Sequence, residues 1–129
     1  MTTDLWMLFA TALLAWVLIL VAAGPGLMKN GLGWAMGNRD SAPPPAPWEA
    51  RAKRASANMQ ENIALFAILV LVAHVSGRHG DLSALGAIVF FAARVAHAVV
   101  YIAGIPGVRT IAWAVSIVGM GMIAADILG

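Results

Sequence analysis

The stretch Arg51-Ala52-Lys53-Arg54-Ala55-Ser56-Ala57-Asn58-Met59-Gln60-Glu61-Asn62 leads without a helix breaker into the apolar segment from Ile63 to Val75. A second apolar segment, Leu82 to Ala103, is interrupted by three polar side chains, Arg94, His97 and Tyr101. Ionisable groups inside a bilayer cost about 2.5–3.5 kcal/mol each on insertion scales, so they usually mark a functional site. The two segments therefore predict neighbouring membrane helices that carry a site.

The composition favours a membrane protein. Of the 129 residues, 61% are hydrophobic and only 11% are charged, which is more apolar surface than a soluble domain of this size could bury. A membrane helix needs about 20 residues to cross about 30 Å of hydrocarbon. The sequence predicts an all-α, integral membrane four-helix bundle, a single domain over residues 1–129, with spans at about 5–23, 62–76 (with a helical extension from about 48), 82–103 and 108–128.

The basic residues gather in two of the expected connections. They are Lys29, Arg39, Arg51, Lys53 and Arg54 before the second span and Arg109 before the fourth, whereas only Arg78 lies in the other turn. The positive-inside bias puts these two connections in the cytoplasm and both termini on the non-cytoplasmic side of the inner membrane. The glycines and prolines between residues 24 and 47 argue against a regular element, so we expect an irregular connection there.

Several kinds of chemistry find no support. Cysteine is absent, which removes disulfides, thiolate metal sites and a cysteine nucleophile. The three histidines are too scattered to indicate a metal site, and no nucleic-acid partner is expected. Any thiol chemistry would therefore need a thiol that arrives with a substrate.

Two of the expected helices carry polar side chains at spacings of three and four residues, which places them on one face. On the second helix these are Arg51, Arg54, Asn58 and Glu61. On the third they are Arg94, His97 and Tyr101. We expect Arg94 to reach back and form an ion pair with Glu61. A purely structural role for Arg94, fixing how the helices dock, remains an alternative.

Arg109 and Thr110 open the fourth helix. Arg109 could simply anchor the chain at the cytoplasmic boundary. Alternatively, its guanidinium lies at the mouth of the same cavity as Tyr101, where a cation would favour a thiolate, the nucleophilic form, over a thiol. A pocket lined by arginines, an asparagine, a glutamate and a tyrosine suits a small zwitterion with more than one carboxylate, because arginine binds carboxylates bidentately.

These motifs resemble those of the MAPEG family, the membrane-associated proteins of eicosanoid and glutathione metabolism. The family's Arg-Ala-x-x-Asn-x-x-Glu run is present from Arg54 to Glu61. The Arg-x-x-His-x-x-x-Tyr run of its prostaglandin E synthase branch is present from Arg94 to Tyr101. In that branch a serine follows the arginine that opens the fourth helix, which is matched here by Arg109-Thr110. The resemblance covers essentially the whole chain.

The resemblance implies a homotrimer that binds glutathione as co-substrate in clefts between adjacent subunits, near the cytoplasmic face. Arg109 would stabilise the thiolate, with Thr110 assisting through its hydroxyl. Five further residues would hold the tripeptide, namely Arg54, Asn58, Glu61, His97 and Tyr101. This chain departs from the prostaglandin branch at Ala57, where that branch has a basic residue, and at Trp113, where it has an aromatic alcohol.

The activity that the resemblance implies is a membrane-bound glutathione-dependent transferase or peroxidase, which presents the thiolate to a lipophilic small molecule from the bilayer. A non-catalytic lipid-binding or scaffold role, which the same family includes, is the alternative, and saturable glutathione binding separates the two. A small four-span multidrug exporter fits poorly, because such exporters place a carboxylate within the first span and residues 5–23 contain none.

Overall fold

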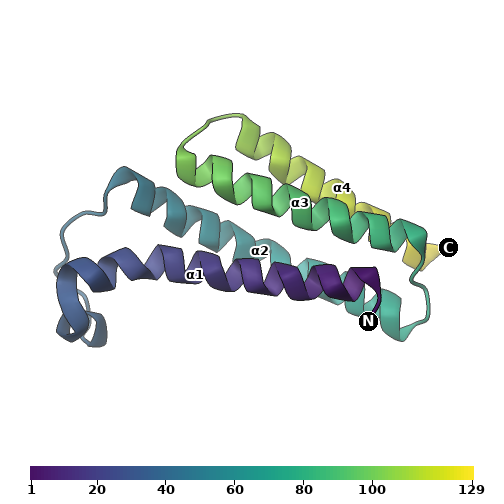
Figure 1. Cartoon of the computed structure of the whole chain (residues 1–129), viewed down its shortest axis with the longest axis horizontal. Helices are drawn as coiled ribbons and strands as arrows, with labels where there is room; N and C mark the ends of the chain where they lie inside the picture. Colours follow the sequence, from purple (N-terminus) through teal and green to yellow (C-terminus); the bar gives the residue numbers. More distant parts are fainter.

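Four long helices make up most of the chain in the computed structural model, which describes residues 1–129 (Figure 1). They are α1 (Thr3–Met36), α2 (Pro47–Val75), α3 (Asp81–Ala103) and α4 (Val108–Leu128), with no strands. All four are long and apolar enough to cross a membrane. The all-α prediction is confirmed, and α2, α3 and α4 begin and end within one residue of the expected bounds.

Successive helices run in opposite directions (Figure 1). Both termini and the α2–α3 turn lie at one end of the bundle, and the α1–α2 and α3–α4 connections lie at the other. We call the second the basic end, because it carries Lys29, Arg39, Arg51, Lys53, Arg54 and Arg109. At this end α1 and α2 project beyond the α3–α4 turn.

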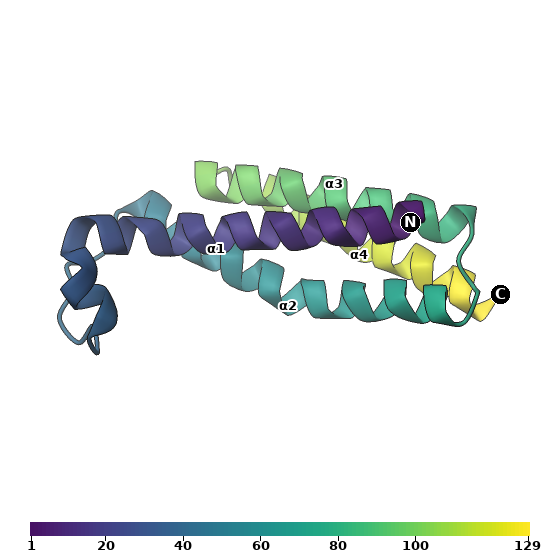
Figure 2. The ribbon, with the colours of Figure 1, turned by 60° about the horizontal axis from the view of Figure 1, so that its bottom comes forward.

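The prediction of an irregular connection starting at residue 24 was wrong for α1. The helix continues through Gly24 and Pro25 to Met36 and departs from helical geometry at Gly31, where φ is 83° and ψ is 169°. Where water is scarce, a continuous helix satisfies the backbone polar groups within the chain itself, and proline is tolerated. Glycine adopts the positive φ at the break without strain. Figure 2 shows the last turns of α1 bent away from the rest of the helix.

The helices α3 and α4 approach closely where two glycines, Gly86 and Gly119, face each other. A Cβ added to Gly119 would lie 2.6 Å from the carbonyl oxygen of Gly86 and 2.8 Å from the backbone nitrogen of Phe90. Small residues allow this approach, and close backbone packing is a main source of helix association in lipid.

The core between α2, α3 and α4 centres on two stacked rings. Phe66 and Phe90 lie with ring centroids 3.9 Å apart and planes within 9°. The buried apolar cluster around them consists of Phe66, Val70, Ala73, Ala87, Phe90, Met120 and Ile123. The helix α1 packs against α2 and α3 but not against α4. The core therefore joins three helices directly, and α1 lies to one side of it.

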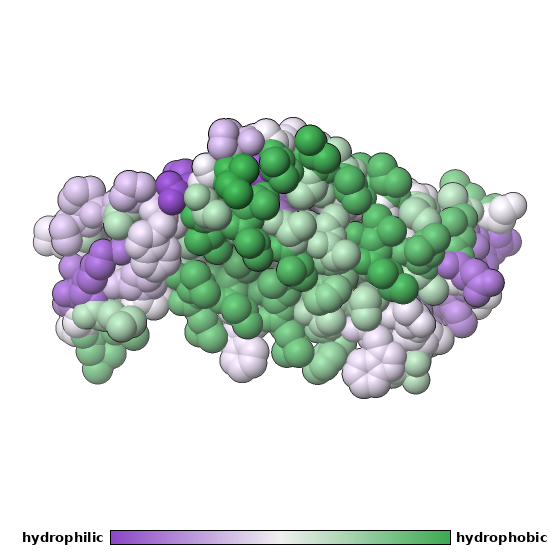
Figure 3. Space-filling view, turned by 45° about the horizontal axis from the view of Figure 1, so that its top comes forward, coloured by the Kyte–Doolittle hydropathy of each residue, from purple (hydrophilic) through white to green (hydrophobic).

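Apolar side chains also cover the outside of the bundle. Figure 3 shows them across the middle of the molecule, with polar residues towards both ends. Trp16, Leu20, Ile68 and Val118 are each more than half exposed. A soluble protein rarely exposes contiguous apolar surface of this extent, whereas lipid tails solvate it. The chain is therefore a multi-pass membrane protein.

One ion pair joins α1 to α2 at the basic end. The ammonium group of Lys29 donates a hydrogen bond to Oε1 of Glu49. The backbone N–H of Ala46 donates to Oε2 of Glu49 at 3.3 Å, which closes the first turn of α2. The hydrogen bond from Lys29 lowers the pKa of the Glu49 carboxyl below its usual value of 4.5. This pair ties the projecting part of α1 to the start of α2.

The lowered pKa of Glu49 predicts a pH dependence. Folding favours the ionised carboxylate, so its contribution to stability is complete above the unfolded-state pKa and is lost as the pH falls through the folded-state value. We expect wild type and Glu49→Gln to differ in melting temperature by a constant amount from about pH 7 to 5 and to converge below about pH 4.5. Thermal melts in detergent test this, with Asp40→Asn, an acid of the same connection without an ion pair, as control. A difference that grows on acidification would contradict the assignment.

Candidate functional site

A cavity of about 200 Å³ opens at the basic end between α2, α3 and α4. Its six lining residues come from all three helices and are Asn58, His97, Tyr101, Arg109, Thr110 and Trp113. Five of these are residues that the sequence singled out as a site. Asn58 of α2, the last turns of α3 and the start of α4 are thus brought to one place.

The α3–α4 turn positions the cation of the site. The helix α3 ends at Gly104, whose φ of 79° is left-handed, and α4 begins after Gly107, with a φ of 81°. Glycine accommodates both values, so the chain reverses within four residues. The reversal carries the Arg109 guanidinium over the Tyr101 ring, with the guanidinium carbon 4.6 Å from the ring centroid.

Tyr101 also contacts His97. The two rings meet edge to face, with centroids 5.4 Å apart and planes at 71°. His97 is buried at 3% exposure, whereas Tyr101 and Arg109 are partly open to the outside. His97, Tyr101 and Arg109 therefore form a row of contacting side chains that leads from the interior to the mouth of the cavity.

Two expected members of the site do not line the cavity. Arg54 and Glu61 are exposed on α2 and are absent from the cavity wall, whereas Asn58, between them in sequence, is part of it. A spacing of three or four residues spreads a row of side chains over a broad stripe. In this chain Asn58 faces the bundle, and the two charged neighbours face outwards.

The expected ion pair between Arg94 and Glu61 is not formed. Arg94 is buried at 1% exposure, and its Nη2 donates to Oδ1 of Asn58 at 2.8 Å. Its Nε and Nη1 have no hydrogen-bond partner in the chain. Glu61 stays on the exposed face, and the neutral amide gives the buried guanidinium an acceptor without the cost of desolvating a second charge. The prediction of this pair was wrong because Asn58 lies nearer to the interior.

The Arg94–Asn58 contact predicts a stability effect. Asn58→Ala removes the one acceptor of a buried guanidinium, and we expect a loss of about 1–3 kcal/mol or more, because an unsatisfied buried charge costs more than a neutral group. Glu61→Gln should leave stability unchanged, since Glu61 is exposed. Thermal melts in detergent without ligand compare the two. Equal destabilisation by both variants would contradict the Arg94–Asn58 contact and would support an Arg94–Glu61 ion pair instead.

Two residues outside the predicted set of site residues contribute to the site. Trp113 joins the cavity wall, one helical turn after Arg109, and that spacing of four residues was the available signal. Arg51 does not face the cavity but donates from Nε to the carbonyl oxygen of Ile102 at 2.9 Å. A cation on the last carbonyls of a helix stabilises its C-terminus, so Arg51 fixes the end of α3 that carries Tyr101.

Comparison with known families adds an independent line of evidence. The sequence model of the MAPEG family matches residues 5–129, nearly the whole chain. No curated protein matches the sequence. The match agrees with four apolar helices and a polar cavity at one end of the bundle, and a match of this extent shows that the chain belongs to the MAPEG family.

Proposed function

We propose that the protein is a membrane-bound glutathione-dependent transferase or peroxidase. The observation that carries the proposal is the Arg109 guanidinium, which lies over the Tyr101 ring in a cavity that also presents the hydroxyl of Thr110 and the amide of Asn58. A fixed cation beside hydroxyl donors is the environment that stabilises a thiolate. Membership of the MAPEG family is consistent with this chemistry.

The cavity of one chain suggests that a second chain completes the site. About 200 Å³ is less than the roughly 300–1,000 Å³ of typical small-molecule sites. Arg54 and Glu61 face outwards beside it and are free to contact a ligand held between subunits. We therefore propose a homotrimer in which Arg54, Asn58, Glu61, His97 and Tyr101 hold the tripeptide. Arg54 would bind a carboxylate, and Glu61 would accept from the ammonium group.

The nucleophile in the proposed reactions would be the thiolate of bound glutathione. Arg109 would favour loss of the thiol proton to solvent, and the hydroxyl of Thr110 would donate to the resulting sulfur anion. With an aryl halide, a carbon–sulfur bond would form and halide would leave. With a lipid hydroperoxide, the thiolate would take the terminal peroxide oxygen as the O–O bond breaks, and the lipid would leave as an alkoxide that takes a proton from solvent to become the alcohol. A second glutathione would then react with the sulfenic acid to give disulfide and water. Binding both reactants side by side supplies the proximity that such steps need.

The position of the site fits substrates of two kinds. The basic end would face the cytoplasm, with both termini on the other side of the inner membrane, as the positive-inside bias favours. Water-soluble glutathione would enter from that side. A lipophilic substrate would reach the cavity from the bilayer along the apolar faces of the helices, which are widely exposed.

Calorimetric titration of glutathione into the purified protein in detergent tests the proposal. We expect saturable binding, and we expect Arg54→Ala to weaken it by at least about tenfold, because a charge-assisted hydrogen bond contributes about 1.5–3 kcal/mol. Arg78→Ala, which removes a cation at the opposite end, is the matched control. Absence of saturable binding would contradict the proposal and would leave a non-catalytic lipid-binding or scaffold role within the family.

A further inference from the structure

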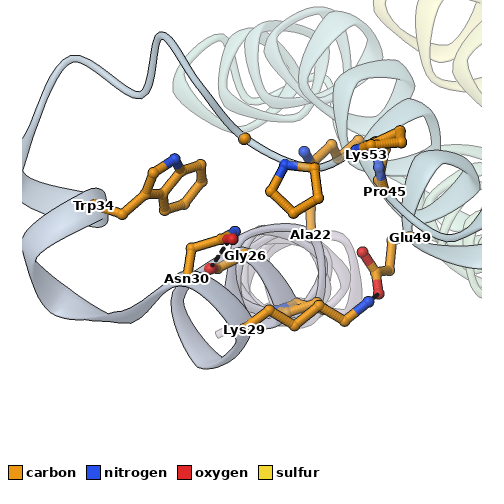
Figure 4. Close-up of a pocket in the computed structure, with 12 residues that line it drawn as sticks. Ala22, Gly26, Lys29, Asn30, Trp34, Pro45, Glu49 and Lys53 are labelled. Atoms are coloured by element: carbon orange, nitrogen blue, oxygen red, sulfur yellow. Dashed lines mark hydrogen bonds and ion pairs between the residues drawn. The ribbon is translucent and has the colours of Figure 1, made fainter.

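A pair of hollows lies beneath the bent end of α1, apart from the cavity described above. The first, of about 200 Å³, is lined by α1, by the prolines of the 37–46 connection and by α2. The second, of about 250 Å³, lies mostly along α1. They share four lining residues, Ala22, Gly26, Trp34 and Lys53, and neither shares a residue with the cavity at Arg109. Figure 4 shows the first hollow, with Trp34 and Lys29 on α1 facing Glu49 and Lys53 on α2.

The second hollow has an unbalanced positive charge. Arg39 and Lys53 both line it, and no acidic side chain does. In the first hollow the one acid, Glu49, is already paired with Lys29. Lys53 forms no ion pair in the chain. Two cations that form no ion pair, on the wall of one concave site, favour an anionic ligand.

Contacts of Trp34 and Arg39 hold the wall of the second hollow in place. Trp34 donates a hydrogen bond from its indole nitrogen to the carbonyl oxygen of Ser41 at 3.2 Å. The guanidinium carbon of Arg39 lies 5.2 Å from the centroid of the Trp34 ring. Arg39 also donates through Nε and Nη2 to the carbonyl oxygen of Ala35, at 3.1 and 2.8 Å. Its φ of 60° is unusual for a residue other than glycine and is held by these contacts. Gly24 adds room, because a Cβ there would meet no atom within 4 Å.

The remaining wall is apolar and continues into the membrane-spanning surface. Leu20, Ala23 and Leu27 line the hollow on α1, and Leu20 and Leu27 are 55% and 45% exposed. Beyond them the end of α1 exposes Met28, Leu32 and Met36, each above 60%. A free anion in water would not need this wall, whereas a lipid presents an anionic headgroup and an acyl chain together.

We propose that the second hollow is a binding site for an anionic phospholipid. Arg39 and Lys53 bind the phosphate of the headgroup, and the first part of an acyl chain lies against Leu20 and Leu27. Basic residues at the membrane surface recognise anionic lipids in this way. The site would fix the bend of α1 at the membrane surface, independently of whether the cavity at Arg109 binds glutathione.

Native mass spectrometry of the intact protein in neutral detergent tests the site, with phosphatidylglycerol and phosphatidylcholine as probes. We expect phosphatidylglycerol to bind at least about tenfold more tightly than phosphatidylcholine, and the double variant Arg39→Gln/Lys53→Gln to lose about tenfold or more of that affinity. Gly24→Leu, which fills the hollow and leaves both cations in place, should weaken binding as well. Arg78→Gln, at the other end of the bundle, should not.

Three results would overturn the proposal. One is equal binding of phosphatidylglycerol and phosphatidylcholine to wild type. Another is unchanged phosphatidylglycerol affinity in both the double variant and Gly24→Leu. The third is displacement of phosphatidylglycerol by glycerol phosphate at equal concentration, since that would show that the apolar wall contributes nothing. The glutathione titration measures binding at the cavity near Arg109, which shares no residue with this hollow. Failure of the lipid proposal can therefore be told apart from failure of the glutathione proposal.

Discussion

Replacing Arg109 by alanine is expected to lower kcat/KM for glutathione conjugation of a chloronitroaromatic by about 100-fold or more. Removing one group that stabilises developing or bound negative charge in an enclosed site typically costs 10²–10³-fold. In this chain the guanidinium over Tyr101 is the one cation in the cavity wall. The thiol of bound glutathione would then ionise little more readily than in water. The rate should recover at alkaline pH, where hydroxide removes the proton instead.

The matched variants separate this role from a structural one. Arg109→Lys keeps the charge and should retain part of the activity. Arg78→Ala removes a cation at the other end of the bundle and should retain all of it. The ultraviolet absorbance of the thiolate, measured with glutathione bound, gives a readout that loss of stability would not move in the same way. If Arg109→Ala turned over as fast as wild type, Arg109 would not be the group that stabilises the thiolate, even if glutathione still binds.

Gly119→Ala is expected to destabilise the bundle by about 3 kcal/mol, at the upper end of what over-packing usually costs. The added methyl would lie 2.6 Å from the carbonyl oxygen of Gly86 and 2.8 Å from the backbone nitrogen of Phe90. Both are backbone atoms of a neighbouring helix, so no side-chain rotation relieves the overlap. The helices α3 and α4 would therefore have to separate to admit the methyl group.

Gly121 supplies the matched control on the same helix. A Cβ at this position meets no atom within 4 Å, so Gly121→Ala should be neutral or slightly stabilising. Thermal melts followed by helical circular dichroism in one detergent compare the two alanine variants. Equal melting temperatures would contradict the close approach of α3 and α4 at Gly119.

Much of the fold was predictable because membrane helices are specified by length and hydropathy. For α2, α3 and α4 the expected bounds were accurate, since polar turns mark where each apolar run stops. The end of α1 was not predictable by the same reasoning. Glycine and proline break helices in water, yet at Gly24 and Pro25 the helix continues, and it bends only at Gly31. Local propensity was overridden by the need to pair backbone groups.

The sequence predicted which residues come together at the cavity better than it predicted the contacts between them. Spacing of three and four residues placed His97 and Tyr101 on one face of α3 and Asn58 on the polar face of α2, and the position of Arg109 at the start of α4 placed it near Tyr101; the structure brings all four to one cavity. The spacing failed for Arg94, which contacts Asn58 instead of Glu61. Periodicity assigns a residue to a stripe but does not say which of two neighbours on that stripe points inwards. That choice depends on how α2 is rotated against α3, which is a property of the packed bundle.

The glycine contact between α3 and α4 has a mechanical consequence for the cavity. Because their backbones touch, we expect these two helices to move together as one hairpin, which carries both Tyr101 and Arg109. Asn58 is the one cavity residue on α2. Within one chain, widening of the cavity would therefore come from displacement of α2, while Tyr101 and Arg109 keep their places on the α3–α4 hairpin.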